Sequence, residues 1–208
     1  YHTSGKLQFK QEYLNGILKN PYLECFENEM CKLITLDTFQ DNRRHAGEGK
    51  SITDDGLVFH NDTDPSIINV LFDDMNNFYG LETSIKFLSN NSYASLIWGY
   101  SNADNFFRCT MTNDGLIRID SYFEGFQTKI SGWEKYDQYN NENVIIRIVQ
   151  SNEKMLLAIN GQEFYNGESP IVTGTKVGVF GSNDVLFKYL KVDEFIDNTN
   201  LNQPHTDY

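Results

Sequence analysis

The stretch Tyr93–Ile119, YASLIWGYSNADNFFRCTMTNDGLIRI, decides the fold of this chain. Two turn signals divide it into three apolar runs: Ser-Asn-Ala-Asp at 101–104 and Asn-Asp-Gly at 113–115. Asn, Asp and Gly accept the positive φ angles of tight turns, and the flanking runs are rich in aromatic and β-branched residues. The stretch therefore predicts three antiparallel strands joined by hairpins.

The same pattern of apolar runs and turn signals extends from Leu36 to Phe195. Short apolar runs alternate with turn clusters, and no segment has the i, i+3, i+4, i+7 spacing of a long amphipathic helix. Regularly spaced short strands indicate an all-β sandwich or barrel. The runs predict strands at Gly56–His60, Ser66–Phe72, Tyr79–Leu88, Ala94–Tyr100, Phe106–Thr112, Leu116–Phe123, Phe126–Ile130, Val144–Gln150, Met155–Asn160, Val177–Phe180 and Val185–Asp193.

Short motifs follow one another in a recognisable order from Asp37 to Val192. They are Asp37-Thr38-Phe39, Trp98-Gly99, Asp104-Asn105-Phe106-Phe107, Asp114-Gly115, Asn143-Val144, Ile159-Asn160-Gly161 and Val185–Val192. In this order they resemble the concanavalin A-like lectin/glucanase superfamily, in its laminin-G-like or 3-keto-disaccharide-hydrolase-like branch. The resemblance implies an all-β jelly-roll β-sandwich of two antiparallel sheets. It does not imply one function, because the superfamily includes lectins, glycan-binding modules, glycosidases and interaction domains.

The N-terminal segment, residues 1–34, has a different pattern. Aromatic-to-glycine units run from Tyr1 to Gly5 and from Tyr13 to Gly16, and Asn15-Gly16 predicts a hairpin. With Lys6-Leu7, these units resemble MORN-type repeats in the variant common in bacterial proteins. We expect truncated β-hairpin repeats over 1–34, with further repeats upstream, the sandwich over 35–197, and an irregular tail over 198–208, where polar residues predominate.

Charge and composition argue against several partners. The net charge is −12, from 17 basic and 29 acidic residues, and the longest basic cluster is Arg43-Arg44, so nucleic acid is not expected. No apolar run is long enough for membrane insertion. Cys25, Cys31 and Cys109 form no C-x-x-C motif, which disfavours a zinc site and favours reduced thiols. The chain starts at Tyr1 without Met, so the localisation stays open between the cytoplasm and export after loss of a leader.

The catalytic motif of the glucanase branch is missing from the sequence. That chemistry needs paired carboxylates on one strand face, spaced E-x-D-x-x-E, and no such string occurs. Asp193 and Glu194 are adjacent and would point to opposite faces of a strand. We therefore expect no catalytic residue, no cofactor and no metal. Calcium is the one exception considered, because the loops Asn61–Pro65 and Phe72–Asn77 collect oxygen ligands.

Aromatic and polar residues around the first hairpins form the candidate ligand site. Trp98 and Tyr100 share strand parity, so we expect both on one face of the sheet. A platform of Trp98, Tyr100 and Trp133 beside Asn105 and Arg108 would suit a sugar, whose C–H groups stack on aromatic rings while its hydroxyls form hydrogen bonds. The competing interpretation is that Trp98 fills the core.

Three functions remain open at this point. The first is a non-catalytic module that binds a carbohydrate or a protein partner. The second is a glycoside-processing enzyme that gathers carboxylates from different strands, and the third is a structural module of a larger assembly. The missing carboxylate motif favours the first function over the second, whereas the sequence barely separates the first from the third.

Overall fold

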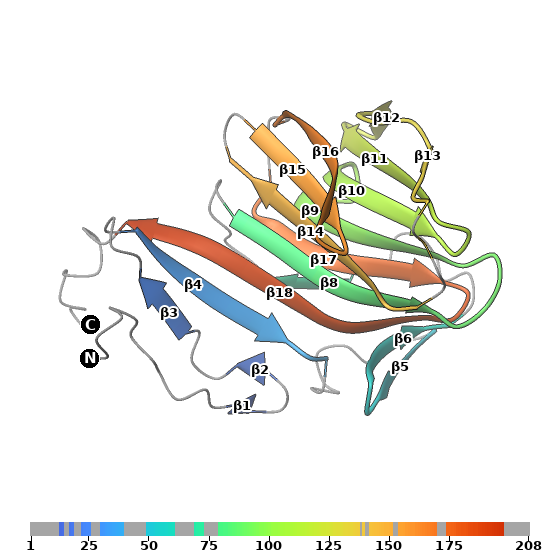
Figure 1. The fold of residues 1–208 in the computed structure, drawn as a ribbon, viewed down its shortest axis with the longest axis horizontal. Coiled ribbons are helices and arrows are strands. Elements are labelled where there is room, and N and C mark those ends of the chain that lie inside the picture. Colours follow the sequence, from blue (N-terminus) through green and yellow to red (C-terminus); the bar gives the residue numbers. More distant parts are fainter. Residues whose placement is uncertain are drawn as a thin grey trace.

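The computed structural model describes residues 13–14, 17–18, 22–25, 30–39, 49–60, 69–72, 79–137, 139, 142–151, 154–169 and 174–197. All regular structure in these ranges is strand, and no helix occurs in them. The strands form two antiparallel sheets that pack as a sandwich (Figure 1). The predicted all-β sandwich of two antiparallel sheets is therefore confirmed.

The larger sheet combines both ends of the described chain. Its strand order is β1 (Tyr13–Leu14), β2 (Ile17–Leu18), β4 (Met30–Asp37), β18 (Val185–Asp197), β8 (Tyr79–Phe87), β14 (Val144–Gln150), β15 (Lys154–Ile159) and β16 (Gln162–Glu168). Three further strands join it from the side: β3 (Tyr22–Cys25) on β4, β6 (Gly56–Phe59) on β18, and β5 (Lys50–Thr53) on β6.

The smaller sheet is built around the hairpins of Tyr93–Ile119. Its order is β12 (Phe126–Lys129), β11 (Leu116–Phe123), β10 (Asn105–Thr112), β9 (Tyr93–Asn102), β17 (Lys176–Ser182) and β7 (Asn69–Phe72). The short strand β13 (Glu134–Lys135) also pairs with β11, further along from β12. Thus the segment from β12 to β13 follows nearly the whole length of β11.

The core lies between the two sheets. From the smaller sheet, Leu96, Cys109 and Ile119 occupy one cross-strand row and are fully buried. In the larger sheet, Leu81 and Ile148 are directly opposite each other on neighbouring strands and are also fully buried. Gly181 lies at the contact between the sheets, because a Cβ added there would stand 3.0 Å from the Phe187 ring and 3.2 Å from the Val185 Cβ.

Strand boundaries agree with the sequence where apolar residues dominate. Leu116–Phe123 and Val144–Gln150 match the predicted ranges to the residue. The strands β5, β13 and β16 were not predicted, and they share a polar composition. All three lie at sheet edges, where side chains remain partly solvated and little apolar alternation is required.

The N-terminal strands pair with the sandwich. β1 pairs with β2 across residues 15–16, as a hairpin requires, and β4 runs beside β18 through eight paired positions from Asp37 to Met30. MORN repeats are not shown, and Asn15, Gly16 and residues 1–12 lie outside the described residues. Since β4 spans the predicted boundary at 34/35, the division into domains stays a prediction, as does the irregular tail 198–208, which is also outside the described part.

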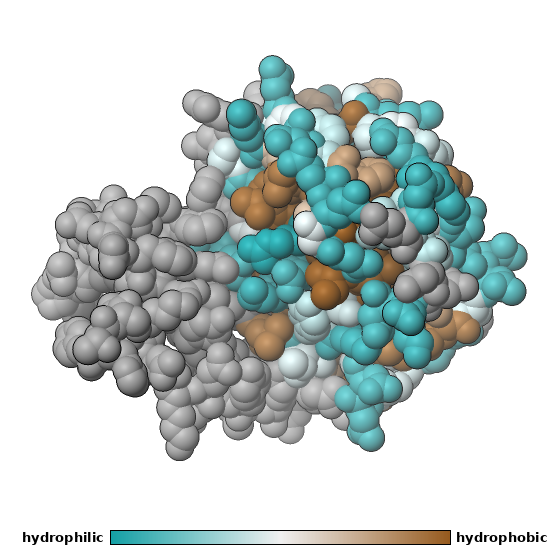
Figure 2. Space-filling model, in the orientation of Figure 1, coloured by the Kyte–Doolittle hydropathy of each residue, from teal (hydrophilic) through white to brown (hydrophobic). Residues whose placement is uncertain are grey.

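The described surface is mostly polar in the view of Figure 2, with smaller hydrophobic patches between the polar residues. Two large exposed hydrophobic residues flank the β11–β12 turn: Phe123 is 58% exposed and Phe126 is 77% exposed. Within the described ranges, no helix has the length and apolar character needed to cross a membrane.

Candidate functional site

Strand alternation gives the smaller sheet an outer face, which is the side turned away from the larger sheet. We define it by Tyr100, Arg108, Arg118, Asp120 and Tyr122. Arg108 is opposite Asp120 on the neighbouring strand, and Tyr122 is two residues further along β11, so their side chains share a side of the sheet. The core residues Cys109 and Ile119 alternate with them and point inward.

A bulge at Gly99 separates the two aromatic residues that were expected to share a face. Gly99 has φ +58°, and the register of β9 shifts at this point against both β10 and β17. Trp98 is fully buried and stacks on Phe107, with ring centroids 5.8 Å apart. Tyr100 instead packs on the outer-face ring of Phe106 at 6.1 Å. The common platform is therefore wrong, because the extra residue of a bulge breaks the two-residue alternation.

An aromatic row crosses one end of the outer face. After Tyr100 and Phe106, the row continues to Tyr122, whose ring stacks on Phe106 with centroids 4.4 Å apart and 11° between the planes. The Arg108 guanidinium lies over the Tyr122 ring at 5.0 Å. Partial burial raises the pKa of the Tyr122 phenol, although the positive charge of Arg108 opposes this shift. The phenol therefore stays protonated at neutral pH and can donate a hydrogen bond.

Two arginines share one buried carboxylate in the next rows. Arg118 Nε donates to Asp120 Oδ2 at 2.9 Å, and Arg108 Nε donates to the same oxygen at 3.4 Å. The Asp120 side chain is fully buried, whereas those of Arg108 and Arg118 are 23% and 15% exposed. Asp120 thus fixes the position of both guanidinium groups from below.

Trp133 reaches this arrangement from the edge of the sheet. It lies between β12 and β13, two residues beyond Ser131, whose hydroxyl accepts from the Ile119 N–H at 2.9 Å and whose own N–H donates to the Ile119 carbonyl at 3.2 Å. The Arg118 guanidinium lies over the Trp133 ring at 4.6 Å. Trp133 is 44% exposed, so part of its ring remains available to a ligand.

Asn105 has a structural role at the start of β10. Its amide donates to Asn102 Oδ1 at 2.9 Å, and its own Oδ1 accepts a hydrogen bond from the Glu124 backbone at 3.1 Å. These contacts join the β9–β10 turn to the β11–β12 turn. The structure therefore brings Tyr100, Arg108 and Trp133 to the outer face, whereas Asn105 stabilises turns at its end and Trp98 belongs to the core.

The outer face ends in an open hollow with a volume of about 600 Å³. The hollow is lined by Tyr93 on β9, Thr112 on β10 and Leu116 on β11. Its remaining walls come from the polar turns 90–92 and 113–114. This volume lies in the range of known small-molecule sites, about 300–1,000 Å³. A ligand on the arginines therefore has room to extend toward Tyr93.

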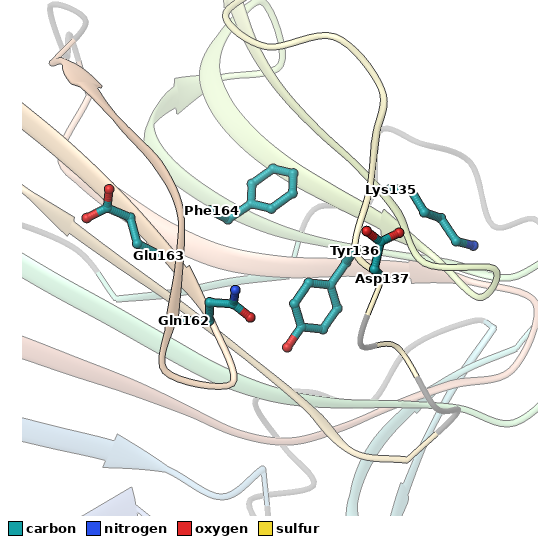
Figure 3. Close-up of a pocket in the computed structure, with 6 residues that line it drawn as sticks. All are labelled: Lys135, Tyr136, Asp137, Gln162, Glu163 and Phe164. Atoms are coloured by element: carbon teal, nitrogen blue, oxygen red, sulfur yellow. The ribbon is translucent and has the colours of Figure 1, made fainter.

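A second, smaller pocket of about 220 Å³ lies where the edges of the two sheets approach each other (Figure 3). Figure 3 shows Tyr136 and Gln162 extending toward one another from the two walls, whereas the charged ends of Glu163 and Lys135 point away. Tyr136 is only 6% exposed, and its hydroxyl is 3.5 Å from the Ile159 carbonyl. The pocket is smaller than the usual range for ligand sites, so the outer face is the stronger candidate.

Two other titratable groups, His60 and Cys109, do not contribute to the outer face. His60 contacts Asp184 through Nδ1 and Ser51 through Nε2, both at 2.7 Å, and neither pocket described above includes these residues. Burial, with a further contribution from the charge of Asp120, raises the pKa of the Cys109 thiol to about 12, so this thiol is not a reactive group near neutral pH.

The two loops considered as an exception for calcium remain untested. Asn61–Pro65 and residues 73–77 lie outside the described residues. Among the residues that the structure does describe, no group of three or more His, Cys, Asp or Glu side chains could hold a metal ion.

Sequence reasoning missed Arg118, Asp120 and Tyr122. The signal was available, because the three residues alternate along one predicted strand and must share a face. They alternate with Ile117, Ile119 and Ser121, which identifies the opposite face as the more apolar one. Sequence spacing did not show that Trp133, eleven residues beyond Tyr122, would return to this face.

Comparison with known proteins shows similarity in structure only. No family model and no curated protein matches the chain. Among solved structures, the chain is similar to the GH43 protein BlXynB of Bacillus licheniformis, with a TM-score of 0.57, 14% identity, and coverage of 86% of this chain and 41% of that one. A xylan beta-1,4-xylosidase of Bacillus halodurans C-125 gives a TM-score of 0.54 and 12% identity, over 91% of this chain and 41% of that one.

A sheep galectin-11 is matched over nearly its whole length. The alignment covers 99% of the galectin and 62% of this chain, with a TM-score of 0.50 and 12% identity. Identities this low show the fold alone. The neighbours are consistent with a concanavalin A-like jelly roll, which is the fold that the sequence motifs implied.

Proposed function

We propose that this chain is a non-catalytic glycan-binding module whose ligand lies on the outer face of the smaller sheet. One observation carries the proposal: Arg108 and Arg118 both donate to the buried Asp120, Trp133 lies against Arg118, and Tyr100 packs on Phe106 on the same face. The similarity to a galectin and to two glycosidase-related structures supports a sugar as ligand, because those proteins are named for sugar binding or sugar cleavage.

The chemistry of the outer face suits a pyranose ring. The exposed part of Trp133 offers an apolar surface to sugar C–H groups, and guanidinium N–H groups donate to hydroxyl oxygens. Both arginines are already held by Asp120 and by an aromatic ring, so little side-chain entropy is lost when a ligand binds. The hollow next to Tyr93 provides space for a second sugar unit.

A glycan array followed by calorimetry tests this proposal. Trp133→Ala should weaken binding of the best array ligand at least tenfold, which corresponds to about 1.4 kcal/mol. Phe126→Ala is the matched control, because Phe126 is the most exposed aromatic residue described and belongs to the same edge segment without facing the arginines. Unchanged affinity in Trp133→Ala and Tyr100→Ala would contradict the proposed site, and an array without any binding sugar would contradict the proposed function.

A glycoside-processing enzyme is the alternative function. The two glycosidase-related structures favour it, since their similarity covers more of this chain than the galectin does. Assays of sugar release from laminarin, xylan and 3-keto-sugars separate the two functions. Turnover that a single Asp or Glu substitution abolishes would replace the binding module by the enzyme.

A further inference from the structure

The outer face carries a local excess of positive charge on an acidic protein. Arg108, Arg118 and Lys129 face the same way as Asp120, because Asp120 is opposite Arg108 on one side and opposite Lys129 on the other. Lys129 is exposed. Three cationic residues and one carboxylate therefore share this part of the face, in a chain whose net charge is −12.

The contacts with Asp120 use only part of each guanidinium group. Both arginines donate to Asp120 through Nε, the nitrogen nearest the backbone. Their terminal Nη groups have no hydrogen-bond partner among the residues that the structure describes. A guanidinium group has five N–H donors, and its two terminal nitrogens can bind both oxygens of one carboxylate. Each arginine thus keeps its terminal donors for another anion.

Aromatic rings hold these donors in place. Tyr122 lies against Arg108 and Trp133 lies against Arg118, at 5.0 and 4.6 Å from the ring centroids. Both arginine side chains are partly exposed, so an anion can approach them without opening the core. A carboxylate attached to a pyranose ring would bind the terminal nitrogens while its ring contacts the exposed part of Trp133.

We infer that the outer face selects acidic sugars, and specifically sugars that carry a uronic acid carboxylate. This inference rests on the proposed glycan-binding function and names its ligand class. The overall negative charge repels long polyanions, whereas the local excess of cations attracts a single carboxylate at short range. Short oligosaccharides with one or a few uronate units therefore fit better than long acidic polymers.

Matched acidic and neutral sugars test the inference. Short oligogalacturonates and glucuronate-bearing xylo-oligosaccharides are compared with their methyl esters, which keep the ring and lose the charge. We expect the acids to bind at least tenfold more tightly than the esters at 50 mM NaCl, and the preference to shrink at 300 mM NaCl as salt screens the charges. Equal binding of acid and ester would overturn the inference and leave the proposed function intact.

Substitutions of single cationic residues test which of them produce the preference for acidic sugars. Arg118→Lys keeps the charge beside Asp120 but loses the planar pair of terminal donors, so it should lose most of the acid preference while remaining folded. Lys86→Gln removes one positive charge from the exposed side of the other sheet and should leave the preference unchanged. A preference that survives in Arg118→Lys and Arg108→Lys would overturn the assignment to these arginines. Binding of neutral array sugars without any acidic sugar would overturn the inference alone, and failure of all sugars to bind would overturn both proposals.

Discussion

The outer faces of the two sheets carry the same chemical groups in opposite proportions. On the smaller sheet, two arginines share the one carboxylate of Asp120. On the larger sheet, one arginine serves two carboxylates: Arg147 contacts Glu82 Oε2 at 2.9 Å and Asp193 Oδ2 at 2.8 Å. The excess groups are therefore guanidinium donors on one face and carboxylate acceptors on the other.

This difference separates a face whose arginines keep terminal donors for a ligand from a face whose arginine uses both terminal nitrogens. Around Arg147, both terminal nitrogens are used, the Tyr189 hydroxyl donates to Glu82 at 2.9 Å, and Lys191 lies 3.6 Å from Asp193. Around Asp120, both arginines donate through Nε, and their terminal nitrogens have no partner within the described part of the chain. We therefore expect substitutions on the larger sheet to change stability alone, and substitutions on the smaller sheet to change stability and binding together.

The largest effect is expected for Asp120→Ala. This change leaves two guanidinium groups beside one another without their buried anion, which removes a buried ion pair and adds repulsion between like charges. Breaking a buried pair costs about 3–5 kcal/mol, and the partial exposure of both arginines favours the lower end, about 3 kcal/mol. Urea denaturation measures the free energy of unfolding, with the exposed turn residue variant Asp55→Ala as control. A loss below 0.5 kcal/mol would show that Asp120 does not hold the arginines.

Arg147→Met should have the next largest effect. Methionine keeps the packing of the aliphatic part of the side chain but leaves Glu82 and Asp193 without their shared cation. Asp193 is only 1% exposed, yet Lys191 remains 3.6 Å away and compensates in part. We expect a loss of about 2 kcal/mol in the free energy of unfolding.

The same variant sharpens the comparison when its sugar affinity is measured by calorimetry. Affinity should equal that of the wild type, since Arg147 belongs to the other sheet. A parallel loss of stability and affinity in Arg147→Met, in protein that is still folded at the assay temperature, would mean that the two faces are not independent.

The sequence predicts the regular strands and the residues that share a face on them, but it does not predict the positions of the aromatic residues of the site. Strands such as Val144–Gln150 follow from continuous apolar runs, and alternation alone places Arg118 with Asp120. The side chain of Tyr100 could not be placed, because alternation assumes a regular strand and the bulge at Gly99 sends Tyr100 to the face opposite Trp98. Trp133 was recognised as a candidate, but its contact with Arg118 depends on how the edge segment between β12 and β13 runs along β11, which no local spacing encodes.

Gly99→Ala should have the smallest effect on stability and addresses the bulge directly. Gly99 has φ +58°, in the left-handed region where a Cβ costs about 1–2 kcal/mol, so we expect a loss of about 1 kcal/mol in thermal or urea unfolding. Gly99→Asn should cost less, because asparagine tolerates this region better than alanine. Gly132→Ala is the matched control, since a Cβ there meets no atom within 4 Å and no positive φ applies. The bulge should also direct Tyr100 to the outer face, so we expect Gly99→Ala to weaken sugar binding more than Gly99→Asn does. Equal sugar affinity in both variants would show that Tyr100 reaches this face for another reason.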